Sequence, residues 1–372
     1  MFLDEKHAIL LESSLYETLK PEPISKLFGL RETANELCSS IILRLFQEVD
    51  VCIKPGICVK RFELIKKLSL LPLYDKFLNF FLFHLAQESI IILDEDRFIF
   101  TESSLPPVSF VLQKIFEIYP KFSPFFSFID RCSREYSSVL SGSKQAVEVL
   151  FPHGDTNLLE GIYQSVSKIG TEEVYLNLAK DILVQSLLAN DQLVNAIEVG
   201  GGQGIFTRVL LPSIDRWCNF YKFTDIGQAL VHEAKRIFGK FKQIKFDVLD
   251  ISKSPSSQGY KRSSFDYLFA FNVVHATEDV KESLTHCASL VKDGGWLFIV
   301  ETVKHQPWID MVYGLLDDWW CFKDKYRSYS PLLSIEKWEE VLSDIGFEKS
   351  FILPSQKYLI KDSDTCLIII KK

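Results

Sequence analysis

The chain has 372 residues, of which 47% are hydrophobic and 24% charged, and a formal net charge of −7. This balance is typical of globular proteins and excludes long disordered or low-complexity regions, and the length suggests two or three domains. The acidic charge argues against a nucleic-acid surface, and the longest apolar stretch, residues 77–86, is too short to span a membrane. Because acidic residues stand where a signal peptide would be basic, we expect a cytoplasmic protein.

Eight cysteines are spaced irregularly along the chain, without a C-x-x-C pair. This pattern does not match the ligand spacing of zinc sites or the framework of a small disulfide-rich domain. We therefore expect buried free thiols in a reducing compartment, and no metal site.

The first 145 residues are predicted to be mostly helical. Apolar residues between positions 74 and 85 recur at the i, i+3, i+4, i+7 spacing of one helix face. Two short apolar runs, 90–93 and 97–100, follow and predict a hairpin. A helix followed by a hairpin is the outline of a winged-helix unit. Since few basic residues are present, we expect it to act as a lid, packing or dimerisation element rather than to bind DNA.

From residue 194 onward, short β-branched and aromatic runs alternate with helical patterns. The predicted strands are 194–199, 220–224, 245–249, 266–271, 296–301, 350–353 and 365–371, and predicted helices include 226–238, 279–291 and 334–345. This alternation predicts an α/β fold with a parallel sheet covered by helices on both faces. Ligands of such sheets bind beyond the carboxyl ends of the strands, where we expect the chemistry to lie.

The strongest motif is EVGGGQG at residues 198–204, directly after the first predicted strand. Glycines let the backbone turn tightly and approach a ligand closely. A nicotinamide fingerprint that starts at Gly200 would require glycine at position 205, which is isoleucine. The arrangement acid-x-G-x-G-x-G is instead typical of proteins that bind S-adenosylmethionine, and the alternative is a glycine-rich turn without a ligand. The expected cofactor-binding residues of this loop are Glu198, Gly200, Gly202 and Gly204.

Two acidic residues follow the next two predicted strands. Asp225 ends the second strand, and its carboxylate is expected to accept hydrogen bonds from both ribose hydroxyls. Asp250 and Ile251 end the third strand and are expected near the adenine amino group and ring. Each acid could instead serve as a helix N-cap. Ile226 and Asn272, at the ends of the second and fourth strands, are assigned to the same cofactor pocket.

A histidine and a glutamate are predicted to meet at the same edge of the sheet. His275 follows the fourth predicted strand, and Glu301 ends the fifth. A carboxylate that holds one imidazole nitrogen fixes the tautomer and raises the basicity of the other, which suits a general base. The alternative for a single loop histidine is a structural role.

The segment after residue 301 is rich in aromatic residues. We expect Trp319 and Trp320 to form a wall over the substrate and Trp338 to lie in the core. The remaining histidines have no catalytic context in the sequence and are expected to be surface or packing residues; they are His7, His84, His153, His232, His286 and His305.

Six segments in order resemble the C-methyltransferase domains of polyketide synthases; they are EVGGGQG, YKFTDI, FDVLDIS, FNVVHATEDV, LVKDGGWLFIVET and YGLLDDWW. The resemblance covers residues 65–355. It implies a winged-helix-like lid at 1–145, a helical connection that contributes to the active site at 146–190, and a Rossmann-like, seven-strand class I methyltransferase domain at 191–372. It further implies S-adenosylmethionine as cofactor, His275 as a base paired with Glu301, and Tyr163 as a residue that positions the substrate.

Two positions depart from the family pattern. The glycine loop reads GGGQG where the family usually has GAGTG, and Asp318 replaces a frequent glycine before the paired tryptophans. The first change should preserve cofactor binding, whereas the second should reshape the acceptor pocket.

The reaction implied by the resemblance is methylation of the α-carbon of a β-ketoacyl thioester on a carrier protein, by a free-standing chain that acts in trans. One alternative is an O-methyltransferase of a small natural product. Another is a non-catalytic cofactor-binding or assembly partner. The sequence leaves open the choice between carbon and oxygen, the identity of the acceptor, and whether the chain forms a homodimer.

Overall fold

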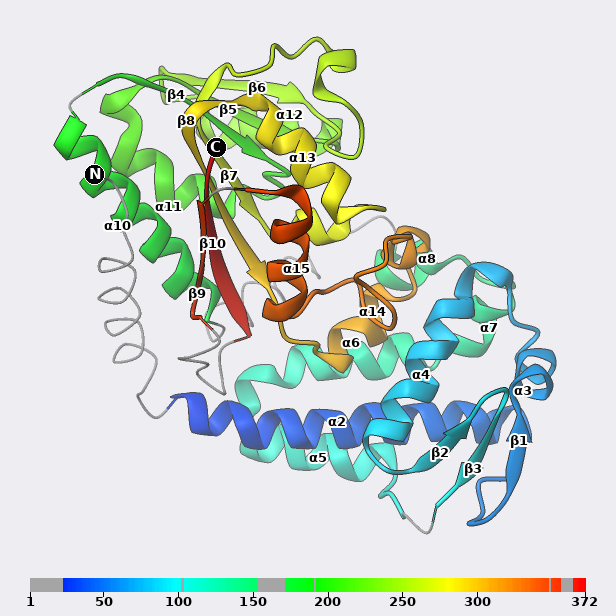
Figure 1. Ribbon diagram of the computed structural model, residues 1–372. Coiled ribbons are helices and arrows are strands. Elements are labelled where there is room, and N and C mark those ends of the chain that lie inside the picture. Colours follow the sequence, from blue (N-terminus) through cyan, green and yellow to red (C-terminus); the bar gives the residue numbers. More distant parts are fainter. Residues whose placement is uncertain (1–22, 102–103, 153–170, 191, 348, 356–363) are drawn as a thin grey trace.

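The computed structural model describes residues 23–101, 104–152, 171–190, 192–347, 349–355 and 364–372. It has two parts, a mainly helical N-terminal part and an α/β part built around a large sheet (Figure 1). The α/β class and the helical N-terminal region expected from the sequence are both confirmed. Among the described helices, none combines the length and apolarity needed to cross a membrane.

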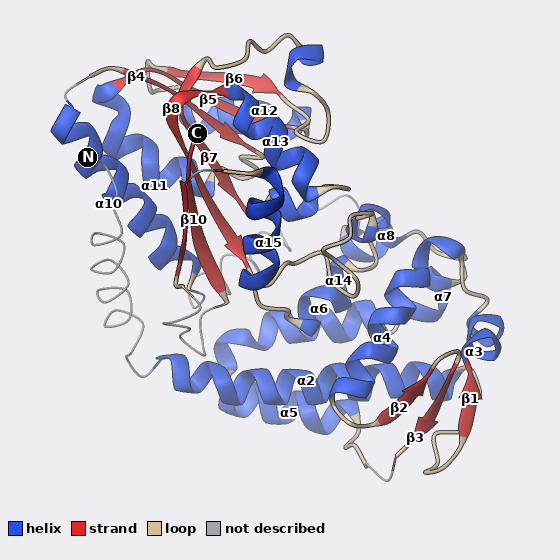
Figure 2. Cartoon of the chain, viewed as in Figure 1, coloured by secondary structure: helices blue, strands red, loops and turns tan. Residues whose placement is uncertain are grey.

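The N-terminal part consists of helices with a small antiparallel sheet at one end (Figure 1). Its elements are α2 (Pro23–Glu48), β1 (Cys58–Lys60), α3 (Arg61–Leu68), η1 (Pro72–Tyr74), α4 (Asp75–Gln87), β2 (Ile91–Asp94), β3 (Arg97–Phe100), α5 (Val108–Ile118), η2 (Pro120–Phe122), α6 (Ser123–Ser133), α7 (Tyr136–Leu140) and α8 (Ala146–Leu150). The predicted helix and hairpin are present as α4, β2 and β3. A third strand, β1, pairs with β3 and was not predicted, because three residues give no measurable alternation (Figure 2).

The α/β part contains all seven predicted strands. Its elements are α10 (Glu172–Asn190), β4 (Val194–Val199), α11 (Ile205–Ile214), η4 (Asp215–Trp217), β5 (Cys218–Asp225), α12 (Gln228–Phe238), β6 (Ile244–Val248), η5 (Pro255–Gln258), β7 (Phe265–Phe271), η6 (Val274–Ala276), α13 (Val280–Leu290), β8 (Val291–Thr302), α14 (Pro307–Tyr313), η7 (Asp317–Trp320), α15 (Ile335–Ile345), β9 (Lys349–Leu353) and β10 (Thr365–Lys371). The strand order is β6-β5-β4-β7-β8-β10-β9. The expectation of an all-parallel sheet is wrong at one edge, because β10 runs antiparallel to both β8 and β9.

Helices cover both faces of the sheet because successive strand residues point to opposite sides. Ala196 packs with α10, α11 and α12 on one face, whereas Ile197 packs with α13 and α15 on the other. The strands are apolar on both sides, as a doubly covered sheet requires. The carboxyl ends of the parallel strands meet at one edge, and the glycine loop and the His275 segment both follow strands at this edge.

The chain between β8 and α15 leaves the sheet and packs against the N-terminal helices. Met311 and Leu315 belong to the same buried cluster as residues of α2 and α4. The Tyr74 hydroxyl donates a hydrogen bond to the Leu315 carbonyl oxygen over 3.2 Å. This segment of the α/β part therefore shares a hydrophobic core with the N-terminal part, which places N-terminal residues beside the carboxyl edge of the sheet.

All eight cysteines are free thiols. Five of them are buried, as expected, namely Cys38, Cys132, Cys218, Cys287 and Cys366. The expectation of burial is wrong for Cys52 and for Cys58, the first residue of β1, which are both exposed.

Candidate active site

The glycine loop follows β4 and leads into α11. Gly200, Gly202 and Gly204 all have positive φ values, of 59°, 52° and 73°. A Cβ atom on Gly200 would lie 2.0 Å from Cγ2 of Val273, so no side chain fits there. A Cβ atom on Gly202 would meet only the Gly200 carbonyl oxygen, 3.9 Å away, so that this face of the loop remains accessible to a ligand.

Asp225 ends β5 and faces the glycine loop. Its Oδ2 accepts a hydrogen bond from the Gly202 amide at 2.9 Å, and its Oδ1 accepts one from the Gly227 amide at 2.8 Å. Each oxygen retains a further lone pair, so the carboxylate can still accept bonds from a diol. The neighbouring Ile226 side chain is exposed. The tip of β5 and the loop after β4 are thus fixed to each other around one acidic group.

Glu198 lies beneath the loop, in the core. Its Oε2 accepts hydrogen bonds from the Tyr221 hydroxyl, at 2.6 Å, and from the Thr207 hydroxyl. Burial raises the pKa of Glu198 to about 7, although both hydroxyl bonds oppose this shift. The carboxyl group therefore joins β4 to β5 and α11, and its contact with a cofactor stays a prediction.

Asp250 and Ile251 follow β6. The Asp250 carboxylate accepts bonds from the amide and hydroxyl of Ser252 and pairs with Lys253 at 3.0 Å. Burial alone would raise the pKa of Asp250, but these bonds outweigh it and hold the pKa below its ordinary value. Ile251 is buried in the core beside α13. These contacts describe a well-ordered turn at the carboxyl edge, and the adenine contacts stay a prediction.

Asn272 connects three elements at the end of β7. Its backbone has a positive φ of 47°. Its side-chain Nδ2 donates to Glu172 of α10 at 3.0 Å, and its Oδ1 accepts a bond from the Thr302 amide at 2.8 Å. Asn272 therefore ties the ends of β7 and β8 together, next to the residues that carry the predicted base.

His275 and Glu301 meet as the sequence predicts. His275 lies in η6 after β7, and its Nδ1 is 2.5 Å from Oε2 of Glu301 near the end of β8. Oε1 of Glu301 accepts the Val274 amide at 2.9 Å. Because the carboxylate can only accept, the neutral imidazole carries its proton on Nδ1, which leaves the lone pair on Nε2. No described residue forms a hydrogen bond with Nε2.

A pocket of about 370 Å³ opens at His275. Its wall combines residues of α8 from the N-terminal part with the segment that follows α14. The other lining residues are Gln145, Ala146, Val147, Ala276, Leu316, Asp317, Asp318, Trp319 and Pro331. Asp318, which departs from the family pattern, thus borders this pocket.

The paired tryptophans differ in role. Trp319 lines the pocket, and its Nε1 donates to Oδ1 of Asp310 at 2.8 Å. Trp320 is buried and stacks on Phe77 of α4 with ring centroids 5.8 Å apart, so the expectation that it faces the substrate is wrong. Trp338 has no exposed surface, which confirms its place in the core.

Two further polar groups near the pocket were not identified from the sequence. His305, expected to be a surface or packing residue, bonds through Nε2 to Oδ2 of the buried Asp310 at 2.5 Å. Asp310 thereby joins His305 to Trp319. The buried Arg327 contacts the loop of His275. No periodicity or motif in the sequence marks these residues, because tertiary folding brings them together with their partners.

Tyr163, which the resemblance assigns to the positioning of the substrate, lies outside the described residues.

Comparison with known proteins agrees with this geometry. A family model described as "Methyltransferase domain" matches residues 197–297. A highly reducing polyketide synthase of Pyrenophora dematioidea is 32% identical over 251 residues, and polyketide synthase ThaQ of Burkholderia thailandensis is 32% identical over 236 residues. The matches cover 65% and 61% of this chain. The chain matches only 10% and 11% of the length of these two relatives.

Among solved structures, the CurJ carbon methyltransferase superposes with a TM-score of 0.84 at 25% sequence identity. This match covers 98% of the chain and 97% of the CurJ structure, so it includes the helical N-terminal part as well as the sheet. The chain therefore contains a methyltransferase domain, and it is similar over nearly its whole length to a solved carbon methyltransferase.

Proposed function

We propose that the chain transfers a methyl group from S-adenosylmethionine to the α-carbon of a β-ketoacyl thioester that is bound to an acyl carrier protein. The observation that carries this proposal is the His275–Glu301 pair, which opens on the 370 Å³ pocket. A carbon acid between a ketone and a thioester must lose a proton before it can accept a methyl group, so the reaction requires a base at the acceptor. The similarity to carbon methyltransferases of polyketide synthases supports this acceptor class.

His275 has the features of such a base. Glu301 is fully buried, and its Oε1 is held by the Val273 and Val274 amides, at 3.3 and 2.9 Å. Its Oε2 can therefore fix the imidazole ring in one orientation. The proton from the α-carbon passes to Nε2, and Glu301 stabilises the imidazolium that forms. The electron pair left on the acceptor becomes the carbon nucleophile.

The residues of the glycine loop and Asp225 fit the proposed cofactor. The loop face at Gly202 is open, and the Asp225 carboxylate beside it retains lone pairs for a ribose diol. S-adenosylmethionine, when bound, supplies a methyl group on a sulfonium centre, which a carbon nucleophile can attack. The chain itself contributes orientation of the two reactants, which can account for several kcal/mol of a displacement barrier.

The proposal is tested with trideuteromethyl-labelled S-adenosylmethionine and β-ketoacyl chains of different lengths on an acyl carrier protein. Mass spectrometry of the acyl chain, followed by fragmentation, should place one labelled methyl group on the α-carbon. A matched α,α-dimethyl acceptor, which has no α-proton, should remain unlabelled. A label on the enol oxygen would instead establish O-methylation, and labelling of the dimethyl acceptor would exclude the α-carbon as the nucleophile.

A further inference from the structure

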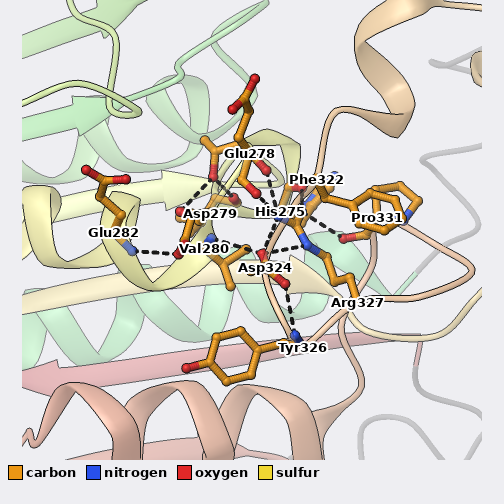
Figure 3. A network of polar contacts seen from close by, with 12 residues as sticks. His275, Glu278, Asp279, Val280, Glu282, Phe322, Asp324, Tyr326, Arg327 and Pro331 are labelled. Atoms are coloured by element: carbon orange, nitrogen blue, oxygen red, sulfur yellow. Dashed lines mark hydrogen bonds and ion pairs between the residues drawn. The ribbon is translucent and has the colours of Figure 1, made fainter. Parts of the chain in front are cut away.

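We infer that Arg327, supported by Asp324, is a positioning residue that fixes the backbone of the loop that carries His275. This inference rests on the proposed role of His275 as the base. Glu301 holds the imidazole ring, but the position of the ring also depends on the position of the backbone that carries it. The structure shows a second attachment, in which Arg327 bonds the backbone of this loop (Figure 3), and no sequence motif predicts it.

The guanidinium of Arg327 binds a row of carbonyl oxygens along the catalytic loop. Its Nη1 donates to the His275 carbonyl oxygen at 2.5 Å, and its Nη2 donates to the carbonyl oxygens of Thr277 and Glu278 at 2.7 and 3.1 Å (Figure 3). Nη1 also lies 3.4 Å from the carbonyl oxygen of Pro331, which lines the pocket. One side chain thus fixes the backbone from His275 to Glu278.

Asp324 compensates the buried charge. The side chains of Arg327 and Asp324 are 0% and 2% exposed. Oδ2 of Asp324 accepts from Nε and Nη2 of Arg327 at 3.0 and 2.5 Å, and it also accepts the Val280 amide at the start of α13, at 3.2 Å. A buried pair of this kind contributes little net stability compared with apolar residues of the same volume. The bonds that this pair forms with the backbone of the loop that carries His275 therefore favour a role in geometry.

The segment that carries Arg327 is itself anchored to the N-terminal part. Lys76 of α4 donates to the Trp320 carbonyl oxygen at 2.8 Å, and its ammonium lies 3.9 Å from the centroid of the Phe322 ring. The Lys323 amide donates to the Glu278 carbonyl oxygen at 2.8 Å. Through these contacts, the position of the His275 loop depends on α4 as well as on the sheet.

Arginine is required for this function because its planar fork presents several donors in a fixed geometry. Lysine keeps the positive charge but has a single nitrogen, which cannot reach the three carbonyl oxygens of His275, Thr277 and Glu278 together. Loss of the hydrogen bonds from Arg327 to these carbonyl oxygens should therefore displace the His275 imidazole without removing it. A misplacement of about 1 Å in a reacting group costs roughly 10²-fold in rate.

The test compares Arg327→Lys with the wild type by proton NMR and kinetics. In the wild type, the Nδ1 proton of His275, held by Glu301, should give a resonance far downfield, identified by its absence in His275→Gln. In Arg327→Lys this resonance should broaden or disappear. Turnover should fall roughly 10²-fold while the Kd for S-adenosylmethionine changes less than threefold.

Arg44→Lys is the matched control, because Nη1 of Arg44 also donates to a buried carboxylate, Oδ1 of Asp130 at 2.9 Å, but Arg44 lies in the N-terminal part. It should lower the melting temperature and leave the His275 resonance unchanged. Asp324→Asn is the second variant, since it keeps the side-chain volume and removes only the charge; it should show the same changes in smaller measure.

Arg327→Lys or Asp324→Asn protein that is folded, with the downfield resonance and turnover of the wild type, would overturn the inference. The same holds if both change only the melting temperature, as Arg44→Lys does. The NMR result does not depend on the acceptor. If the wild type shows the resonance and Arg327→Lys loses it, yet no β-ketoacyl acceptor is methylated, the proposed function fails and the positioning role stands.

Discussion

His275 and Glu301 are 26 residues apart in the chain, yet Nδ1 of one lies 2.5 Å from Oε2 of the other. The two residues meet because β7 and β8 are neighbouring parallel strands, with Phe271 paired to Val300 at their carboxyl ends. His275 lies four residues after Phe271, and Glu301 directly follows Val300. The parallel register therefore creates the pair, in which the buried Glu301 holds Nδ1 of a histidine that lines the pocket.

Replacement of His275 by Ala should lower turnover by about 10²–10⁴-fold, the usual contribution of a positioned general base. Glu301→Gln should also slow turnover, because an amide stabilises the imidazolium less than a carboxylate does. The double variant should be hardly slower than His275→Ala alone, since the two residues act as one unit. Binding of S-adenosylmethionine, measured by calorimetry, should be retained in all three. Wild-type turnover in His275→Ala would remove the histidine from the mechanism.

Asp225→Asn should weaken the thermal stabilisation that S-adenosylmethionine or its demethylated product confers. A ligand present at 100 times its Kd stabilises the native state by about 2.7 kcal/mol, and loss of a carboxylate acceptor should remove most of this effect. Asp247→Asn is the control, because Asp247 lies on the adjacent β6 and its carboxylate pairs with Lys222. Equal ligand-induced shifts in the two variants would exclude Asp225 from the binding site.

Asp310→Ala should affect the acceptor rather than the cofactor. It leaves the Trp319 indole N–H and His305 without their shared partner, which should cost about 1–3 kcal/mol of stability. Because Trp319 lines the pocket, the KM for the acceptor should rise while the Kd for S-adenosylmethionine stays constant. Trp338→Phe is the control, since substitution of this core residue should lower the stability of the protein without a change in the KM for the acceptor. An unchanged KM in Asp310→Ala would show that Trp319 does not contact the acceptor.

Glu198 should make stability fall as the pH rises from about 4.5 to 7. Burial raises the pKa of Glu198 from 4.5 to about 7, so the folded state binds more protons than the unfolded state in this interval. The contribution of the protonated Glu198 to the free energy of unfolding is fully present below pH 4.5 and is lost by about pH 7. At about 1.4 kcal/mol per pH unit, the upper limit is about 3 kcal/mol.

Urea denaturation of Glu198→Gln and the wild type at several pH values tests this expectation. His84 acts in the opposite direction, since burial lowers its pKa to about 4, so the wild-type profile alone is not diagnostic. The stability of Glu198→Gln relative to the wild type should increase between pH 5 and pH 7.5. A constant difference across this range would contradict the raised pKa.

The sequence by itself determined the sheet and the residues at its edge. Alternation of apolar runs with helical patterns identified all seven strands of the sheet, because backbone hydrogen bonding and burial impose these periods locally. The glycine loop, Asp225, His275 and Glu301 were placed correctly at the carboxyl edge, since each directly follows or ends a strand. Such positions follow from the strand assignment and from the rule that ligands of α/β sheets bind beyond the carboxyl ends of the parallel strands.

Only the tertiary structure decided which residues surround the pair. Trp319 faces the pocket while its neighbour Trp320 stacks on Phe77, because the segment after β8 packs against the N-terminal helices rather than the sheet. Arg327 reaches the His275 loop across 52 residues. These contacts involve irregular segments, in which side-chain direction follows from long-range packing and not from a local period.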